Sequence, residues 1–329
     1  MRTGGHLNAQ APGAEDLEVA VEVRDLVKTF PAPGGGTLTA VARVSFTVAR
    51  GEVFGFLGPN GAGKTTTLEI AEGLQPPTAG RTLVLGLDSQ RDRHRVKERI
   101  GVQLQAGAYF DFLTLEEILD LFGSFYPRRV PPAQLLEKVG LLDRRKSLVR
   151  QLSGGQAQRF SVVAAMVNDP EVVFLDEPTT GLDPQARRNL WDLITSINRE
   201  EGKTVVLTTH YMEEAQVLCD RVAIIDHGRI QALDTPLGLI HTLPTAYRIL
   251  IAARGEVPDG ELRSLPGVRE VVPATGGFTH ELRVGRAQVT LPALLRWAGS
   301  RGVEVDDMQV LPATLEDVFL AVTGHALRE

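Results

Sequence analysis

A glycine-rich loop carries the clearest chemical signal in the sequence. Its residues satisfy the pattern G-x-x-x-x-G-K-[ST], and it follows the apolar stretch Glu52–Leu57 and precedes a helical run. Glycines let backbone N–H groups wrap closely around a phosphate, and the N-terminus of the following helix attracts anions. The sequence therefore predicts that a nucleotide is bound by Gly58, Pro59, Asn60, Gly61, Ala62, Gly63, Lys64, Thr65 and Thr66. Among these, Lys64 should reach the β- and γ-phosphates, and the Thr65 hydroxyl should ligate Mg²⁺.

An acidic pair follows a second apolar run. Val172–Leu175 is continuously apolar, as expected of a strand covered on both faces, and Asp176 and Glu177 come directly after it. A carboxylate at the end of a neighbouring parallel strand is well placed for Mg²⁺, which predicts that role for Asp176. Glu177 points elsewhere and suits a general base that aligns an attacking water. Taken alone, the pair could also be two solvated acids.

The segment Leu152–Gln156 offers a second anion site upstream of the acidic pair. Its small residues Ser153, Gly154 and Gly155 would open a helix, whose N-terminus favours negative charge. Together with the glycine-rich loop, this Leu-Ser-Gly-Gly-Gln segment resembles the ATP-binding subunits of ABC transporters. The resemblance covers about residues 17–235 and implies a P-loop NTPase fold and an active ATPase that uses ATP and Mg²⁺.

Four further positions match motifs of that family. Phe30 resembles the aromatic residue on which adenine stacks, Gln105 the Q-loop glutamine near Mg²⁺, Asp183 the D-loop residue, and His210 the switch histidine at the γ-phosphate. On its own, His210 could as well be a polar surface residue. The resemblance thus implies that Glu177 and His210 are catalytic. It also implies a metal site made by Thr65, Gln105 and Asp176.

The family resemblance also implies partners. Two copies in a head-to-tail homodimer would place Ser153, Gly154, Gly155 and Gln156 against the partner's ATP. The patterns Gly55–Asn60 and Ala313–Phe319 resemble ABC-2-type exporters, the daunorubicin-resistance class among them. We therefore expect a separately encoded membrane permease, with this chain peripheral on the cytoplasmic face of the membrane. The exported substrate, of drug, lipid or polysaccharide type, is not encoded here. The alternative is a regulatory switch that dimerises with ATP and transports nothing.

The elements that must position these motifs form two expected domains. Residues 1–16 lack periodicity and are expected to be a flexible tail. Apolar strands alternate with helices over residues 17–240, which predicts an α/β domain with a helical subdomain at about 106–166. Residues 245–329 follow the order strand-helix-strand-strand-helix-strand and end in a helix, which predicts a small ferredoxin-like α+β domain.

Composition narrows the class of protein further. The chain has 329 residues, and 35 Lys+Arg against 41 Asp+Glu give a net charge of −6, which argues against nucleic acid as a partner. The basic run Arg91–Arg99 is better explained as a solvated helix face. A single cysteine and the lack of a long apolar stretch predict an intracellular protein without a membrane span. The seven histidines show no metal-ligand spacing, so no metal beyond Mg²⁺ is expected.

An aromatic segment, Tyr109–Leu113, supplies three rings directly after Gln105 in a chain with only 5% aromatic residues. Aromatic side chains are enriched at the centres of protein interfaces. Some of these rings could therefore line a groove that receives a short cytoplasmic helix of the permease. The other interpretation, that they form the core of the helical subdomain, remains equally open.

Overall fold

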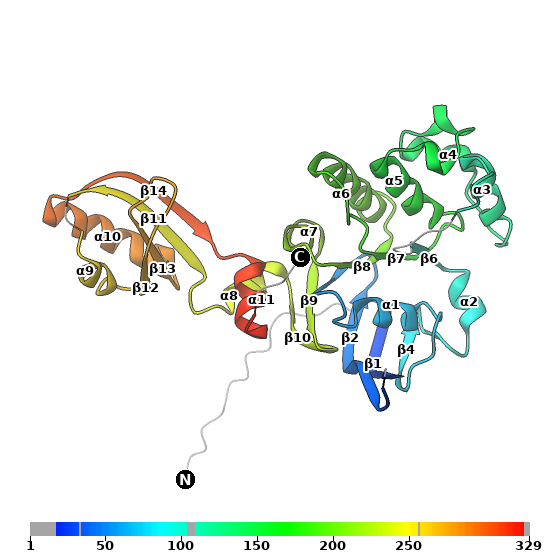
Figure 1. Cartoon of the computed structure of the whole chain (residues 1–329), viewed down its shortest axis with the longest axis horizontal. Coiled ribbons are helices and arrows are strands. Elements are labelled where there is room, and N and C mark those ends of the chain that lie inside the picture. The colour runs from blue at the N-terminus through cyan, green and yellow to red at the C-terminus, as the bar shows by residue number, and fades with distance from the viewer. Residues whose placement is uncertain (1–17, 33, 104–108, 256, 326–329) are drawn as a thin grey trace, which may run out of the picture.

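The computed structural model describes residues 18–32, 34–103, 109–255 and 257–325, which form two lobes (Figure 1). The larger lobe contains the glycine-rich loop and is built on two sheets. The expected tail, 1–16, and Gln105 lie outside the described residues. Within the described part of the chain, we find no helix long and apolar enough to cross a membrane.

A six-stranded sheet forms the centre of the larger lobe. Its order is β10-β9-β3-β8-β7-β6, and all neighbours are parallel except the β9–β10 hairpin. The strands are β3 (Val53–Leu57), β6 (Ile100–Gln103), β7 (Val172–Asp176), β8 (Thr204–Thr209), β9 (Arg221–Asp226) and β10 (Arg229–Asp234). Every residue of β3, β7 and β8 is buried, as the continuous apolar run Val172–Leu175 predicts for β7. The carboxyl ends of β3 and β7 therefore bring the glycine-rich loop and the acidic pair to one edge.

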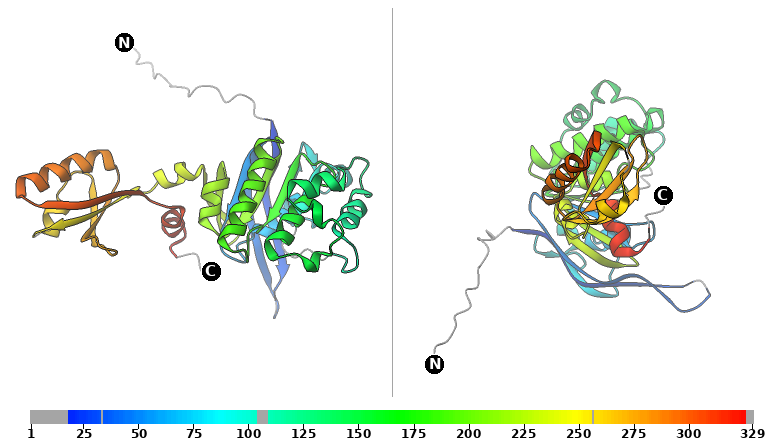
Figure 2. Two further views of the ribbon diagram at one scale, coloured as in Figure 1. Left: turned by 90° about the horizontal axis from the view of Figure 1, so that it is seen from above. Right: turned by 90° about the vertical axis from the view of Figure 1, so that its left-hand side faces the viewer.

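An antiparallel sheet packs against one face of the central sheet. Its order is β2-β1-β4-β5, with β1 (Val19–Pro31), β2 (Thr37–Ala49), β4 (Ala79–Val84) and β5 (Leu87–Asp88). The core between the sheets is aromatic: the Phe46 ring stacks on Phe54 at 5.3 Å and meets the edge of Phe56 at 5.0 Å. The β1–β2 hairpin extends well beyond this core (Figure 2), so its end is available to border a ligand.

Helices pack on both faces of the central sheet and build the helical subdomain. The helices of the larger lobe that precede residue 242 are α1 (Lys64–Ala71), α2 (Arg93–Lys97), α3 (Leu115–Gly123), α4 (Pro132–Lys138), α5 (Gly154–Ala164), α6 (Pro184–Arg199), α7 (Met212–Leu218) and α8 (Pro236–His241). Helices α3, α4 and α5 lie between β6 and β7, where the sequence predicts a helical subdomain (Figure 1). A capping box between Thr114 and Glu117 starts α3. The amphipathic α3 buries Leu115, Ile118 and Leu119.

The smaller lobe has a core of its own. Its sheet order is β12-β13-β11-β14, with antiparallel neighbours throughout. Its elements are β11 (Tyr247–Arg254), α9 (Asp259–Arg263), β12 (Val268–Pro273), β13 (His280–Val284), α10 (Ala287–Arg301) and β14 (Glu304–Pro312). This is the element order that the sequence predicts, and it is the β-α-β-β-α-β arrangement of ferredoxin-like modules. The buried residues Ile249, Leu282 and Leu294 join sheet to helix.

The last helix, α11 (Leu315–Thr323), lies apart from the smaller lobe. It packs against α7, α8 and β10 of the larger lobe, as Figure 1 shows in red. The sequence places it with residues 245–329, but Leu315, Val318 and Phe319 are fully buried in the core of the larger lobe. The reason is the spacing of these three residues, which forms one apolar face that α8 covers through Leu239 and Ile240. The smaller lobe is thus an insertion between α8 and α11.

Candidate functional site

The loop between β3 and α1 borders a cavity of about 500 Å³. The cavity is lined by Phe30, Leu38, Ala40, Pro59, Asn60, Gly61, Gly63, Lys64, Thr65, Thr66 and Glu177. A volume of this size suits a small-molecule ligand of nucleotide dimensions. Leu38 and Ala40 were not predicted. Leu38 lines the cavity because the antiparallel register of the β1–β2 hairpin pairs it with Phe30, a tertiary relation that leaves no motif in the sequence.

Two glycines of the loop are required by the space around them. A Cβ on Gly58 would lie 2.2 Å from the Ile225 carbonyl oxygen, and one on Gly63 would lie 2.3 Å from that of Ala40. Gly63 also has φ +100°, a conformation that other L-residues rarely adopt. The backbone of the loop is therefore held tightly against strands β2 and β9.

Lys64 lies buried at the start of α1, 4% exposed. Its Nζ donates to the carbonyl oxygens of Gly58, at 2.6 Å, and Pro59, at 3.1 Å. The same atom lies 3.3 Å from Glu177 Oε1. Burial lowers the pKa of Lys64, and the charge of Glu177 opposes this effect. The lysine is thus a preformed cation at the floor of the cavity.

Glu177 follows β7 directly and is 6% exposed. Its Oε2 accepts a hydrogen bond from Thr180 Oγ1 at 3.1 Å and lies 3.2 Å from His210 Nδ1. Burial alone would raise the pKa of Glu177, but the charges of Lys64 and His210 and the hydrogen bonds from Lys64 and Thr180 together hold it below its ordinary value. Its φ of +47° is strained for a residue with a side chain. The geometry therefore fixes an ionised carboxylate that can accept a proton beside the cavity.

Asp176 and Thr65 meet as the sequence predicts. Thr65 Oγ1 donates to Asp176 Oδ2 at 3.0 Å, and Thr208 Oγ1 donates to Asp176 Oδ1 at 2.5 Å. A hydroxyl and a carboxylate at this spacing are hard oxygen donors of the kind that Mg²⁺ prefers. The donor set therefore fits the metal, while Gln105, its third predicted ligand, lies outside the described residues.

The Leu152–Gln156 segment and Asp183 do not join this cavity. Ser153 caps α5 by accepting from the Gln156 N–H, and Gln156 Oε1 accepts from the Ser153 N–H. Ser153 and Gly154 are exposed at that helix N-terminus. Asp183 caps α6, since its Oδ1 accepts from the N–H groups of Gln185 and Ala186. The second predicted anion site therefore lies outside the cavity that Lys64 lines, as expected if a second molecule completes the site.

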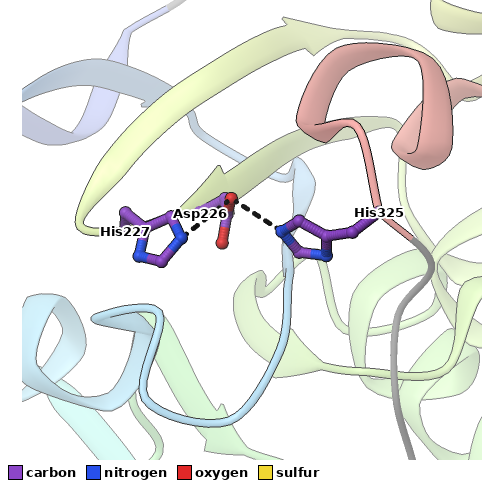
Figure 3. A group of neighbouring side chains, drawn as sticks. All are labelled: Asp226, His227 and His325. Atoms are coloured by element: carbon purple, nitrogen blue, oxygen red, sulfur yellow. Dashed lines mark hydrogen bonds and ion pairs between the residues drawn. The ribbon is translucent and has the colours of Figure 1, made fainter.

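The β9–β10 turn carries a polar group that the sequence did not predict. Asp226 Oδ2 lies 3.2 Å from His325 Nε2 and 3.8 Å from His227 Nε2, with the rings on opposite sides of the carboxylate (Figure 3). These three residues offer potential metal ligands within 4.8 Å of one another. Sequence spacing missed them because His325 follows α11 at the far end of the chain. The neighbouring Gly228 donates to the Ala62 carbonyl, so this group ties the segment after α11 to a turn that contacts the glycine-rich loop.

The aromatic segment separates into one inward and two outward rings. Tyr109 packs edge-on against Phe160 at 5.3 Å, and burial raises its pKa to about 12. Phe110 and Phe112 are 47% and 76% exposed, with ring centres 6.1 Å apart. The core interpretation therefore applies to Tyr109 alone.

Other proteins share both the sequence and the fold. Residues 41–180 match the family model described as ABC transporter. The linearmycin resistance ATP-binding protein LnrL of Bacillus subtilis (strain 168) is 35% identical over 89% of this chain and 96% of its own length. The daunorubicin resistance ATP-binding protein DrrA3 of Streptomyces coeruleorubidus is 37% identical over 89% and 94%.

The solved structures agree with this relationship. A dimeric ATP-binding cassette, MJ0796, in a post-hydrolysis state bound to ADP and Pi has a TM-score of 0.59 and 26% identity. It covers 65% of this chain, and the match spans 98% of the cassette. The cavity, the Lys64–Glu177 pair and the Thr65–Asp176 pair thus lie in a fold whose relatives bind nucleotides. This chain belongs to the ABC transporter family and is the ATP-binding, ATP-hydrolysing subunit of a transporter.

Proposed function

We propose that this chain powers export through a separately encoded ABC-2-type permease. Two of its relatives are named for resistance to linearmycin and to daunorubicin, and both align with nearly their full length to this chain. The described residues contain no membrane-spanning helix, so the proposed pathway lies in the permease. The chain then acts peripherally at the cytoplasmic face of the membrane. Its substrate would be of drug, lipid or polysaccharide type.

In this proposal, hydrolysis depends on residues placed around the cavity. Lys64 binds the β- and γ-phosphates, Phe30 stacks on adenine, and Glu177 accepts a proton from the attacking water. His210, beside Glu177, contacts the γ-phosphate. Thr65, Asp176 and Gln105 would hold Mg²⁺, which when bound neutralises phosphate charge.

The single observation that carries the proposed mechanism is the division of the site. Lys64 and Glu177 face the cavity, while Ser153 and Gly154 stand exposed on the helical subdomain. A head-to-tail homodimer supplies the missing half to each cavity, with Asp183 near the junction, and the dimeric cassette supports this arrangement. ATP that binds the closed dimer more tightly than the open monomer shifts the equilibrium toward closure.

The test of transport is the dependence of membrane association on a permease. The full chain should sediment with membranes only when a neighbouring gene for a protein of about six transmembrane segments is co-expressed. Equal sedimentation with and without that protein would refute the assignment. The rival function, an ATP-dependent dimerisation switch that transports nothing, predicts ATP-dependent dimers and no such association. The resemblance of the smaller lobe to small ligand-sensing domains supports this rival function.

A further inference from the structure

The β9–β10 turn and the end of α11 bring two imidazole rings to one carboxylate, outside the residues that line the nucleotide cavity. Asp226 Oδ2 lies 3.2 Å from His325 Nε2 and 3.8 Å from His227 Nε2. Figure 3 shows that a nitrogen of each ring faces the same carboxylate oxygen. The three potential ligand atoms all lie within 4.8 Å of one another. Two nitrogens and one oxygen thus converge on a single small volume.

The carboxylate of Asp226 requires a cation. Asp226 is only 5% exposed, and a buried charge is costly unless an opposite charge compensates it. Among the described residues, its ion pairs are with His227 and His325, not with a lysine or an arginine. An imidazole is a cation only when it is protonated, so two neutral rings leave the carboxylate uncompensated. A metal ion bound between the three side chains supplies the positive charge.

The distances agree with a tetrahedral metal ion. Zn²⁺ binds imidazole nitrogen and carboxylate oxygen at about 2.0–2.2 Å, which places neighbouring ligand atoms about 3.3–3.5 Å apart. The separations of 3.2 Å and 3.8 Å from Asp226 Oδ2 lie on either side of that range. The contact of His227 is longer than a hydrogen bond, but its side chain is 87% exposed, so the ring has room to approach. Imidazole ligands favour Zn²⁺ over Mg²⁺, which prefers oxygen alone.

The backbone holds both histidines in place. Helix α11 ends at Gly324, whose φ of +79° turns the chain so that His325 follows directly. Thr323 Oγ1 donates to the His325 carbonyl oxygen at 3.0 Å, and the His325 ring meets Phe319 edge-on at 5.9 Å. His227 has a φ of +47°, which costs energy for a residue with a side chain. A histidine at this turn position therefore indicates a use for its ring.

We propose that Asp226, His227 and His325 form a binding site for Zn²⁺, with a water molecule as the fourth ligand. The ion joins positions 99 residues apart and fastens the end of α11 to the larger lobe, where the chain returns from the inserted smaller lobe. Gly228, next to His227, donates to the Ala62 carbonyl oxygen at 3.0 Å. The ion thus also steadies the turn that contacts the glycine-rich loop. This site does not depend on the proposed transport function.

The test is a calorimetric titration of the full chain, without an affinity tag or nucleotide, with Zn²⁺. Excess Mg²⁺ keeps Zn²⁺ from the oxygen ligands of Thr65 and Asp176. The wild type should bind one equivalent of Zn²⁺. His227→Gln and His325→Gln should each weaken binding at least about tenfold, and the double variant should bind none at this site, because glutamine offers no imidazole nitrogen. His94→Gln is the matched control, since His94 is exposed on α2 and lies outside the group.

Thermal unfolding supplies a second readout. The three ligands meet only in the folded chain, so Zn²⁺ should raise the unfolding temperature of the wild type and of His94→Gln. It should leave that of the double variant unchanged, and circular dichroism verifies that this variant is folded. If the wild type does not bind Zn²⁺, or if the folded double variant binds it as tightly, the inference is overturned and the group is an ion-pair cluster only. The proposed transport function stands in either case.

Discussion

Replacement of Glu177 by glutamine tests the proposed chemistry most directly. Glutamine has nearly the same size and can still accept the hydrogen bond from Thr180, so packing is preserved. What it loses is the negative charge that accepts a proton. General bases contribute about 10²–10⁴-fold to rate, so turnover should fall by that factor, or about 3–5 kcal/mol in the activation barrier.

The same substitution should strengthen ATP binding. In the wild type, Glu177 lies 3.3 Å from Lys64 Nζ and competes with phosphate for that cation. At an effective dielectric constant of about 20, the attraction at this distance amounts to about 5 kcal/mol before solvation is counted. Removing it frees Lys64, so ATP should bind at least about tenfold more tightly and persist in a closed dimer.

The assay combines steady-state phosphate release with gel filtration in ATP. Glu177→Gln should elute as an ATP-loaded dimer, whereas Glu213→Gln, the same change at an exposed position on α7, should behave as the wild type. A variant at Glu177 that remains monomeric and hydrolyses ATP within tenfold of the normal rate would refute the role of the carboxylate.

Four other changes give distinct outcomes. Lys64→Ala should weaken ATP binding about 100-fold, measured by calorimetry, because a charge-assisted contact worth about 3 kcal/mol disappears; unchanged affinity would remove Lys64 from the site. Phe319→Ala should lower the free energy of unfolding by about 3–5 kcal/mol in urea, since the ring is fully buried between α11 and the larger lobe; a neutral effect would mean that α11 is not part of that core. Joint replacement of Phe110 and Phe112 by alanine should reduce transport without lowering the unfolding temperature, because both rings are exposed; a variant that fails to fold would show instead that they belong to the core. Glu72 should make stability depend on pH: its pKa rises from 4.5 to about 8 on folding, so the folded chain holds the extra proton between these values. The stability that this group contributes is fully present below pH 4.5 and is lost as the pH rises toward 8, on the order of 3 kcal/mol between pH 5 and 8. Glu72→Gln should abolish this pH dependence of the free energy of unfolding, measured by denaturant titrations.

Sequence alone predicted the chemistry of the nucleotide site. Continuously apolar strands such as Val172–Leu175 predict burial on both faces, and the glycines of the loop allow backbone conformations that other residues rarely adopt, such as φ +100° at Gly63. The predicted strands and the α/β fold are confirmed because each depends on local patterns that packing did not override. The close contact between Thr65 and Asp176 could be anticipated, since parallel strands end at a common edge.

Tertiary structure decided what those local patterns cannot encode. The sequence shows that α11 has one apolar face, but only packing reveals that Phe319 is buried against the larger lobe. Leu38 lines the nucleotide cavity because strand register pairs it with Phe30. Asp226 contacts His325, which lies 99 residues later in the chain. Glu72 reads as an ordinary helical acid until the fold removes its solvent and leaves its oxygen without a partner. The reason is the same in each case: residue type and spacing specify local geometry, whereas desolvation and long-range contacts exist only after the elements have packed.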